Sequence, residues 1–356
     1  MKILHVINSL GAGGAEKLVS SLAKKQAETN VVGVFTFNNE NDIFTDIEAS
    51  SLQHVNTKSN NYFSLKNIIE LIKTIKNYDV IHVHLFPSLY IVGFISFFLK
   101  KEYIFTEHNT YNRRRDKSFL KPIEKIIYSR FKPIICISKS VKLELEKWIG
   151  KKKEMIVIPN FIDLKEIGNA KPIDRKLLDF NNNNKLLVMV GSFSQQKDQL
   201  TILKALIELP DDFKLILIGD GVLRNKIEEF IDENKLNSRV KLLGLRNDVY
   251  SILKSCGYGI QSSHWEGFGI AALEYMACGL ITFGSNVNGL NEIIPDKNLL
   301  FEVGDFKQLA SLLLEIKNDK ENQKQILELQ YDKIKKYDIS YSISQHSKLY
   351  KAQLDS

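Results

Sequence analysis

Two carboxylates, Glu266 and Glu274, flank a glycine-rich turn that could bind an anion together with its hydroxyl groups. The sequence predicts a loop ending in Gly267-Phe268-Gly269, then a helix that Gly279 closes in a left-handed cap. The unpaired N–H groups and positive end of such a helix favour a phosphate, which glycine allows to approach the backbone. A carboxylate there would repel the phosphate unless it accepts hydrogen bonds from hydroxyl groups. The pair therefore predicts a site that takes a phosphate between two polyols, a sugar and a ribose.

Motifs along nearly the whole chain resemble those of the family 4 retaining glycosyltransferases, whose Glu-x7-Glu motif matches Glu266 and Glu274. The others are Gly-Ala-Gly-Gly-Ala-Glu (11–16), Thr-Glu-His (106–108), Ile-Pro-Asn-Phe-Ile-Asp (158–163), Gly-Ser-Phe-Ser-Gln-Gln-Lys-Asp (191–198), Ile-Gly-Asp-Gly (218–221), Leu-Gly-Leu-Arg-Asn-Asp-Val (243–249) and Gly-Leu-Asn-Glu-Ile-Ile (289–294). Their common order and spacing make the resemblance more specific than any single motif. It implies the GT-B architecture: two doubly wound, Rossmann-like parallel-sheet domains facing a cleft.

The resemblance also implies roles for residues of the donor site. Glu274 would bind the ribose hydroxyls, and Arg246 would border the nucleobase. Glu266 would hold the donor sugar. The backbone groups of the adjacent residues would also hold the donor sugar; these residues are Gly267, Phe268, Gly269 and Ile270.

Further residues are expected around the departing phosphate and the reacting carbon. Lys197 follows the first strand of the second domain, where a cation can stabilise a leaving diphosphate. By resemblance, Gly13 and Gly14 contact the diphosphate or the acceptor through their backbone. His108, at the carboxyl edge of a predicted strand, would lie under the donor sugar. With Lys197 and Glu266 it completes the predicted catalytic set, although His82, His84 and His264 compete for that role.

The sequence departs from the family at two positions. Ser192 stands where the family usually has an arginine, so Ser192, backbone amides or Arg246 must supply that contact. Phe161 replaces a glycine of the interdomain hinge. No two aspartates are separated by one residue, so a strict Asp-x-Asp metal carrier is absent. We therefore expect transfer without a metal or any other cofactor, as the resemblance also implies.

Short apolar runs alternate with helical patterns and predict two parallel sheets. The predicted strands of the first are Lys2–Ile7, Val31–Thr36, Val80–Val83, Tyr103–Thr106 and Ile134–Ile137. Those of the second are 185–191, Lys214–Ile218, Val240–Leu243, Tyr258–Gln261 and Leu280–Phe283. We expect an N-terminal acceptor-binding domain over residues 1–163 and a donor-binding domain over 164–339. By resemblance, a last helix at about 340–356 packs back on the first domain.

Charge is unevenly distributed along the chain. Residues 1–165 hold 25 Lys and Arg against 16 Asp and Glu, a net +9, and the remainder holds 24 against 26, a net −2; these sum to +7. Within the first part, Phe119, Ile123 and Ile126 recur at helical spacing among lysines. Such a basic amphipathic helix could contact an anionic membrane surface or a lipid diphosphate, or its apolar face could be ordinary core.

Several classes of location and partner are disfavoured. A nucleic-acid partner would rest on charge alone, because no zinc-finger spacing, aromatic-basic signature or basic tail is present. The N-terminus enters a strand directly, with no export signal, and three cysteines without metal-ligand spacing indicate a reducing compartment. The apolar run Leu89–Leu99 is about half as long as a bilayer crossing and predicts a buried helix. We expect a cytoplasmic protein, in contact with the inner face of the plasma membrane if the basic helix binds lipid.

The predicted function is sugar transfer from a nucleoside-diphosphate-sugar, a UDP-sugar by family precedent, to an acceptor hydroxyl with retention. The acceptor expected is a lipid-diphosphate-linked glycan of a bacterial surface polysaccharide. A dehydrogenase is disfavoured because Glu16 stands at the third glycine of the dinucleotide fingerprint. A sugar-nucleotide epimerase of the same architecture would turn over donor without acceptor. A scaffold subunit, inactive because of Ser192, would bind nucleotide without turnover.

Overall fold

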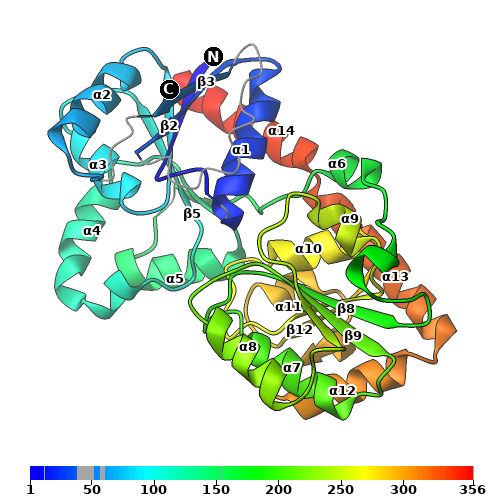
Figure 1. The fold of residues 1–356 in the computed structure, drawn as a ribbon. Helices are drawn as coiled ribbons and strands as arrows, with labels where there is room; N and C mark the ends of the chain where they lie inside the picture. The colour runs from blue at the N-terminus through cyan, green and yellow to red at the C-terminus, as the bar shows by residue number, and fades with distance from the viewer. Residues whose placement is uncertain (12, 38–51, 57–60, 153, 356) are drawn as a thin grey trace. The chain divides into compact units, whose positions relative to one another are not determined.

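The computed structural model describes the chain except residues 12, 38–51, 57–60, 153 and 356. It divides into two compact units: unit 1 is Met1–Phe161 with Ile339–Ser356, and unit 2 is Ile162–Asp338. Each unit is a parallel sheet with helices on both faces (Figure 1). The prediction of two doubly wound parallel sheets is therefore confirmed.

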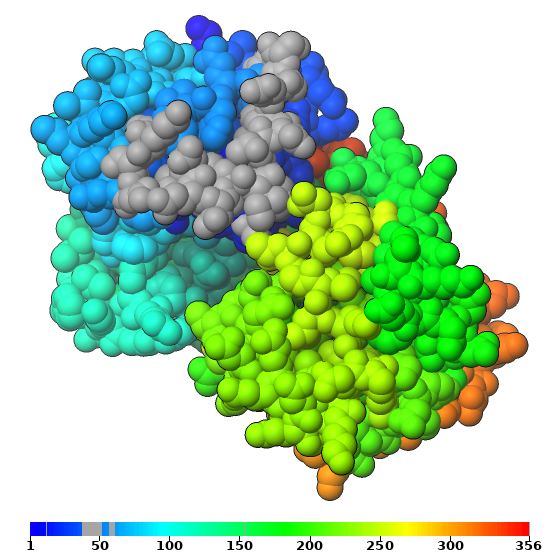
Figure 2. Space-filling model, in the orientation of Figure 1, coloured from blue at the N-terminus to red at the C-terminus, as the bar shows by residue number. Residues whose placement is uncertain are grey.

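Unit 1 contains a seven-stranded sheet in the order β3-β2-β1-β4-β5-β6-β7. Its strands are β1 (Lys2–Ile7), β2 (Val31–Thr36), β3 (Leu52–Asn56), β4 (Val80–His84), β5 (Glu102–Glu107), β6 (Ile134–Cys136) and β7 (Met155–Val157). Its helices are α1 (Gly14–Ala27), α2 (Leu65–Ile75), α3 (Ser88–Ile95), α4 (Lys121–Tyr128), α5 (Lys139–Ile149) and α14 (Ile339–Leu354). The C-terminal α14 packs against α1, and its red atoms adjoin blue N-terminal ones in Figure 2.

Unit 2 contains a six-stranded sheet in the order β10-β9-β8-β11-β12-β13. Its strands are β8 (Lys185–Val190), β9 (Phe213–Ile218), β10 (Val240–Leu242), β11 (Tyr258–Gln261), β12 (Ile281–Ser285) and β13 (Leu300–Phe301). Its helices are α6 (Leu164–Asn169), α7 (Gln199–Glu208), α8 (Arg224–Glu233), α9 (Val249–Leu253), α10 (Ile270–Ala277), α11 (Leu290–Ile293), α12 (Phe306–Ile316) and α13 (Lys320–Ile334). Figure 1 shows α7, α8 and α12 on one side of this sheet and α9 and α10 on the other.

The strand order of each sheet reverses once, and this reversal places a binding site. In unit 1 the chain turns back between β1 and β4, and in unit 2 between β8 and β11. The loops after these strands diverge to opposite faces, which leaves a crevice at the carboxyl ends where ligands of open α/β sheets bind. In unit 2 the two loops are residues 191–198 and 262–269, which carry most of the predicted donor site.

The surface of α3 and α4 differs from the prediction of a buried apolar helix over Leu89–Leu99. Leu89 and Val92 are buried, but Phe94 and Phe98 are 64% and 74% exposed. The neighbouring α4 is likewise exposed at Ile123. We define the α3–α4 surface as the exposed residues Phe94, Phe97, Phe98, Phe119, Ile123 and Ile126. Within the residues that the structure describes, no helix is long and apolar enough to cross a bilayer.

A chain of polar side chains runs through the core of unit 1, between the sheet and the helices α1 and α14. It contains His5 of β1, His82 and His84 of β4, and His346 and Tyr350 of α14, all of which are buried. His5 Nε2 lies 2.8 Å from the Gln26 amide oxygen, and His82 Nδ1 lies 2.6 Å from the Tyr350 hydroxyl. These contacts satisfy polar groups that would otherwise be costly to bury.

Burial keeps these imidazoles uncharged near neutral pH, because a positive charge is poorly solvated in the core. It lowers the pKa of His5, His108 and His346 to about 4, from an ordinary value of 6.5. Burial, together with the neighbouring histidines, holds the pKa values of His82 and His84 well below that value. The core of unit 1 is therefore a neutral hydrogen-bonded network.

This network predicts that unit 1 loses stability in mild acid. Between pH 6.5 and 4 the unfolded chain binds protons on these histidines that the folded unit does not, so stability falls as the pH falls. Going from pH 7.5 to 5.5 should cost about 1.3 kcal/mol for each histidine whose pKa falls from 6.5 to about 4. Urea unfolding of Trp265→Phe, which leaves Trp148 of unit 1 as the only tryptophan, measures the effect.

Unit 2 provides the matched control, because its one histidine is the partly exposed His264. The variant Trp148→Phe leaves Trp265 to report on that unit. We expect its unfolding midpoint to move much less than that of unit 1 over the same pH range. Equal midpoints for unit 1 at pH 7.5 and 5.5 would contradict the neutral network.

Candidate functional site

The predicted donor residues of unit 2 meet where the loops after β8 and β11 face each other. Lys197 of the first loop forms an ion pair with Glu266 Oε1 of the second. The backbone N–H of His264 donates to the Gln196 carbonyl at 2.8 Å and ties the same two loops together. The structure therefore brings Lys197 and Glu266 into direct contact at the predicted anion site.

The two oxygens of the Glu266 carboxylate have different surroundings. Besides Lys197, Oε1 accepts hydrogen bonds from Ser263 Oγ at 2.9 Å and from Gln261 Nε2 at 3.2 Å. No group of the described chain hydrogen-bonds to Oε2. The side chain is buried, with Glu266 only 7% exposed, so the three donors to Oε1 hold the carboxylate in one orientation. Oε2 is left to accept a hydrogen bond from a ligand.

Gln261 is itself held by a tyrosine of α10. The Tyr275 hydroxyl donates to Gln261 Oε1 at 3.2 Å and accepts from the Val190 N–H, at the end of β8, at 2.6 Å. The Tyr275 ring lies on Gly259, where an added Cβ would come within 2.5 Å of ring carbons. Only a glycine at position 259 leaves room for the tyrosine that orients Gln261.

The helix α10 starts at Ile270, beside the carboxylate, as the sequence predicts. Gly269 precedes it with a φ of 93°, a left-handed conformation that favours glycine. No side chain caps this helix start, so its first N–H groups point into the site with the positive end of the helix dipole. Phe268 is buried and packs edge-on against Tyr337 with ring centroids 5.6 Å apart. Gly279 ends the helix in the predicted left-handed conformation, with a φ of 82°.

Glu274 lies on α10 and is also buried. Its Oε1 accepts a hydrogen bond from the Tyr250 hydroxyl of α9 at 3.0 Å. Burial, followed by the charge of Glu274, raises the pKa of Tyr250 far above its ordinary value, so this hydroxyl keeps its proton and donates. Tyr250 thus orients Glu274 much as Gln261 and Ser263 orient Glu266.

The two expected alternatives for the missing arginine have other contacts. Arg246 donates from Nε and Nη2 to the two carboxylate oxygens of Asp248, at 2.8 and 2.7 Å. Ser192 is exposed; its Oγ lies 3.2 Å from Ser194 Oγ, and its carbonyl accepts from Gln199 Nε2 at 2.9 Å. Lys197 is therefore the cation that directly contacts Glu266 at this edge of the sheet.

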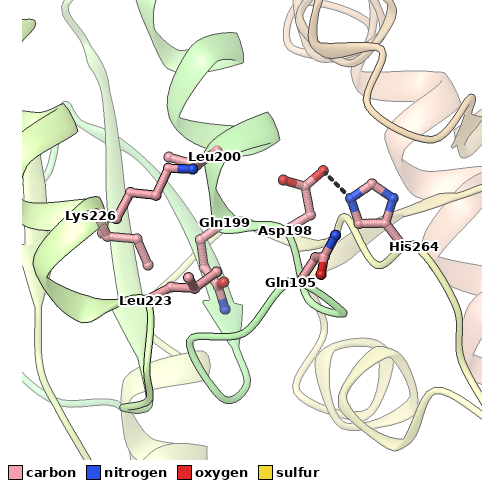
Figure 3. A pocket seen from close by; sticks show the side chains of 8 residues that line it. Gln195, Asp198, Gln199, Leu200, Leu223, Lys226 and His264 are labelled. Atoms are coloured by element: carbon pink, nitrogen blue, oxygen red, sulfur yellow. Dashed lines mark ion pairs between the residues drawn. The ribbon is translucent and has the colours of Figure 1, made fainter. Parts of the chain in front are cut away.

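A cavity of about 190 Å³ lies beside these loops, at the start of α7 and α8 (Figure 3). His264 and Asp198 form one side of it, with His264 Nε2 3.4 Å from Asp198 Oδ2. Lys226 and Leu223 of the α8 side lie opposite. His264 was one competitor for the role of the catalytic histidine, and the structure places it here, paired with a carboxylate.

The predicted residues of unit 1 lie at the carboxyl edge of its own sheet. His108 directly follows β5, and its Nε2 lies 3.3 Å from His84 Nδ1. Gly13 and Gly14 are exposed at the start of α1, with Gly13 as the N-cap in extended conformation. The segment that follows His108, from Asn109 to Lys117, is held by an ion pair between Arg115 and the buried Glu107 at 3.2 Å.

Two further arrangements in unit 1 bear on metal and anion binding. His5, His82 and His84 have ligand atoms that all lie within 4.8 Å of one another, close enough to consider a metal ion. Arg114 and Arg115 of the basic segment 113–115 are instead engaged internally, by Glu124 at 3.2 Å and Glu107 at 3.2 Å. Arg113 is the exposed residue of the three.

Sequence reasoning did not identify Gln261, Ser263, Tyr250 or Tyr275 as part of the site. Ser263 lies three residues before Glu266, a spacing that could have indicated a local hydrogen bond. Nothing in the sequence pattern indicates Tyr250 or Tyr275, because their partners come from elements brought together only by the sheet.

The chain was compared with known families, curated proteins and solved structures. Residues 12–166 match the family model glycosyltransferase family 4, and residues 170–332 match the model glycosyl transferases group 1. An uncharacterized glycosyltransferase of Methanocaldococcus jannaschii is 32% identical over 270 residues, covering 73% of this chain and 70% of that protein. The UDP-Gal:alpha-D-GlcNAc-diphosphoundecaprenol alpha-1,3-galactosyltransferase of Escherichia coli is 29% identical, covering 72% and 71%.

A solved structure of HepE from Anabaena, in complex with UDP and glucose, superposes with a TM-score of 0.85 at 21% identity, covering 99% of this chain and 100% of that one. This likeness identifies the fold as GT-B. The matching family models, the Methanocaldococcus jannaschii relative and the fold agree with the motifs identified in the sequence. The chain therefore belongs to the glycosyltransferases, with a family 4 domain followed by a group 1 domain.

Proposed function

We propose that this glycosyltransferase moves a sugar from a nucleoside-diphosphate-sugar to a hydroxyl of a lipid-diphosphate-linked glycan, with retention of configuration. The observation that supports a nucleoside-diphosphate-sugar donor is that the two carboxylate oxygens of Glu266 have different hydrogen-bond surroundings. Its Oε1 is saturated by three donors and its Oε2 is left as an acceptor, beside an uncapped helix start. A hydroxyl and a phosphate of one ligand suit this combination.

Each donor residue has a role in this proposal. Glu266 Oε2 accepts a hydrogen bond from a hydroxyl of the donor sugar, and Glu274, oriented by Tyr250, accepts from the ribose. The N–H groups at the start of α10 and the ammonium of Lys197 stabilise the diphosphate as negative charge develops on the leaving oxygen. Arg246 borders the nucleobase.

The transfer step needs no separate general base from the protein. In a front-face displacement, the anomeric C–O bond to the phosphate breaks while the acceptor oxygen bonds to the same face. The departing phosphate oxygen takes the acceptor's proton, and the glycosidic product keeps the donor configuration. Glu266 and Glu274 are then binding groups, because a glycosidase-type pair would require both acids to flank the anomeric carbon. Gly13, Gly14 and His108 contribute from the acceptor-binding side.

Two observations support a lipid-linked acceptor. The Escherichia coli relative is named for transfer of galactose to a diphosphoundecaprenol-linked sugar. The α3–α4 surface of this chain exposes four phenylalanines and two isoleucines near basic side chains, with the Arg130 guanidinium 4.6 Å from the Phe97 ring centroid. Apolar side chains among cations suit the headgroup region of an anionic membrane. We propose that this surface rests on the cytoplasmic face of the membrane during assembly of a surface polysaccharide.

The donor role of Glu266 is tested by Glu266→Gln. The three donors will hold the amide oxygen at the Oε1 position, which turns the NH2 group towards the ligand and replaces an acceptor by a donor. We expect acceptor-dependent nucleotide release to fall by about 100-fold, the effect of one mispaired buried group near the developing charge. The assay measures nucleoside diphosphate release from a panel of sugar nucleotides with polyprenyl-diphosphate-sugar.

Glu228→Gln is the matched control, because Glu228 lies on α8 in an exposed pair with Arg224 at 2.8 Å. It should retain wild-type turnover. Equal rates for the two variants would refute the role of Glu266. Wild-type release without any acceptor would favour a sugar-nucleotide epimerase, and tight nucleotide binding without turnover would favour a scaffold subunit.

Metal independence and retention are tested in the same reaction. We propose that Lys197 and the start of α10 replace a divalent ion at the leaving diphosphate, so EDTA should change the rate by less than about twofold. The anomeric proton of the product should show the coupling of the donor's own configuration. Loss of activity in EDTA that Mg²⁺ restores, or an inverted anomer, would refute the corresponding part of the proposal.

The membrane role of the α3–α4 surface is tested by sedimentation with vesicles containing anionic lipid. Replacing Phe98 and Ile123 by serine removes buried area on the membrane but none in the core, so bound protein should fall by about tenfold with unchanged thermal stability. Leu177→Ser is the control, since Leu177 is 78% exposed but lies in unit 2. Equal binding by both variants would contradict this role.

A further inference from the structure

A continuous line of hydrogen bonds runs from His108 into the core of unit 1. His108 Nε2 lies 3.3 Å from His84 Nδ1, and His84 Nε2 lies 3.1 Å from His5 Nδ1. His5 Nε2 lies 2.8 Å from Gln26 Oε1. All partners of His108 in this line are buried. His108 itself is half-buried at the carboxyl edge of the sheet and follows the last residue of β5.

A second branch starts from the same glutamine. Gln26 Nε2 donates to the Tyr350 hydroxyl at 3.4 Å. That hydroxyl lies 2.6 Å from His82 Nδ1, and His82 Nε2 lies 2.6 Å from Thr106 Oγ1. The amide of Gln26 is therefore the joint between two branches, one ending at His108 and the other at Thr106.

The orientation of this amide determines where every proton in the first branch lies. An amide oxygen only accepts, so His5 carries its proton on Nε2 and accepts at Nδ1. His84 must then donate from Nε2 and accept at Nδ1, and His108 must donate from Nε2. Each imidazole is neutral and has one proton to give, so no bond in the branch lacks a proton or holds two.

We propose that His84, His5 and Gln26 are positioning residues that hold His108 in the Nε2–H tautomer and direct its Nδ1 lone pair towards a substrate hydroxyl. Among the described residues, no side chain or backbone group hydrogen-bonds to His108 Nδ1. The contact with a sugar hydroxyl rests on the proposed glycosyltransferase reaction. The tautomer of His108 does not rest on that reaction, because it follows from the hydrogen bonds of unit 1 alone.

The first branch disfavours the other neutral tautomer of His108. The other neutral tautomer would place a proton on His108 Nδ1, which would repel a hydroxyl hydrogen, and would leave His84 Nδ1 facing a second lone pair. Two acceptors left facing each other in a buried site cost the energy of an unmade hydrogen bond. The second branch meets the first only at Gln26, whose amide nitrogen donates to the Tyr350 hydroxyl of α14.

The same imidazoles could instead be considered as a metal site, since the ligand atoms of His5, His82 and His84 lie within 4.8 Å of one another. In the structure, however, both nitrogens of each of these rings already lie near a hydrogen-bond partner. A bound ion would displace those partners. The line of hydrogen bonds accounts for the positions of these rings, because each of their nitrogens has a partner. The experiment must therefore exclude metal binding as the alternative.

The test compares His84→Ala with His82→Ala in the full chain labelled with 15N-histidine. The two residues are two positions apart on β4 and both buried, but only His84 belongs to the branch that ends at His108. Long-range 1H–15N correlation spectra assign the proton of His108 to Nδ1 or Nε2. Metal content is measured on the same samples.

For the wild-type protein and for His82→Ala, we expect His108 to be protonated on Nε2, and His82→Ala to retain the wild-type kcat within about twofold. For His84→Ala, we expect a mixture of tautomers and a kcat lower by about tenfold, the effect of one buried hydrogen bond. His84→Asn should restore the Nε2–H form and most of the rate, because its amide oxygen can accept where Nδ1 did.

The Nδ1–H form in the wild-type protein would overturn the proposal, as would a His108 tautomer unaffected in His84→Ala, or a stoichiometric metal ion. If His84→Ala does not fold, Gln26→Leu and His84→Asn supply the same comparison. Absence of sugar transfer by the wild-type protein would refute the proposed function instead, while the NMR result would still decide the tautomer.

Discussion

The buried carboxylate of Glu266 is the constraint on which the proposed donor site depends. A carboxylate removed from water must have its charge compensated and its oxygens hydrogen-bonded. Lys197, Gln261 and Ser263 do this for one oxygen only, and they come from the loop after β8, the end of β11 and the loop that follows. The reversal of strand order between β8 and β11 brings these segments together. The packing of Tyr275 on Gly259 then fixes Gln261, so the core of unit 2 determines the direction in which Glu266 Oε2 accepts.

The two units position their functional groups by opposite electrostatic means. In unit 2 the orientation of Glu266 comes from an ion pair and two neutral donors, and charge is kept at the site. In unit 1 the array behind His108 is neutral, because burial keeps the histidines unprotonated, and order comes from the direction of its hydrogen bonds. Under the proposed function, a charged anchor suits Glu266, which would receive a polyol next to a phosphate. Under the proposed function, a neutral array suits His108, because it remains a hydrogen-bond acceptor without adding charge.

The fold could be largely predicted from the sequence, since strands with buried side chains on both faces form mostly apolar runs, as in Lys185–Val190 and Phe213–Ile218. The described strands that escaped prediction are short or have polar residues; β13 has two residues, β7 has three, and β3 contains Gln53 and His54. Lys197 and Glu266 were each identified from the sequence, but the ion pair between them was not predicted. Two residues that support Glu266 and Glu274 were missed because their partners are distant in sequence. The hydrogen bond between Tyr250 and Glu274 spans 24 positions and that between Tyr275 and Val190 spans 85, and both depend on packing. The exposure of Phe94 and Phe98 was missed for a related reason. An apolar run predicts burial, but it does not show which of its side chains remain exposed.

The most direct measurement is a crystal structure of the full chain with a bound nucleoside-diphosphate-sugar. We expect a hydroxyl of the sugar within hydrogen-bond distance of Glu266 Oε2, with Gln261 and Ser263 still bonded to Oε1 and the diphosphate at the start of α10. A donor bound away from that helix start, or a sugar hydroxyl bonded to Oε1 with Gln261 and Ser263 turned aside, would contradict it.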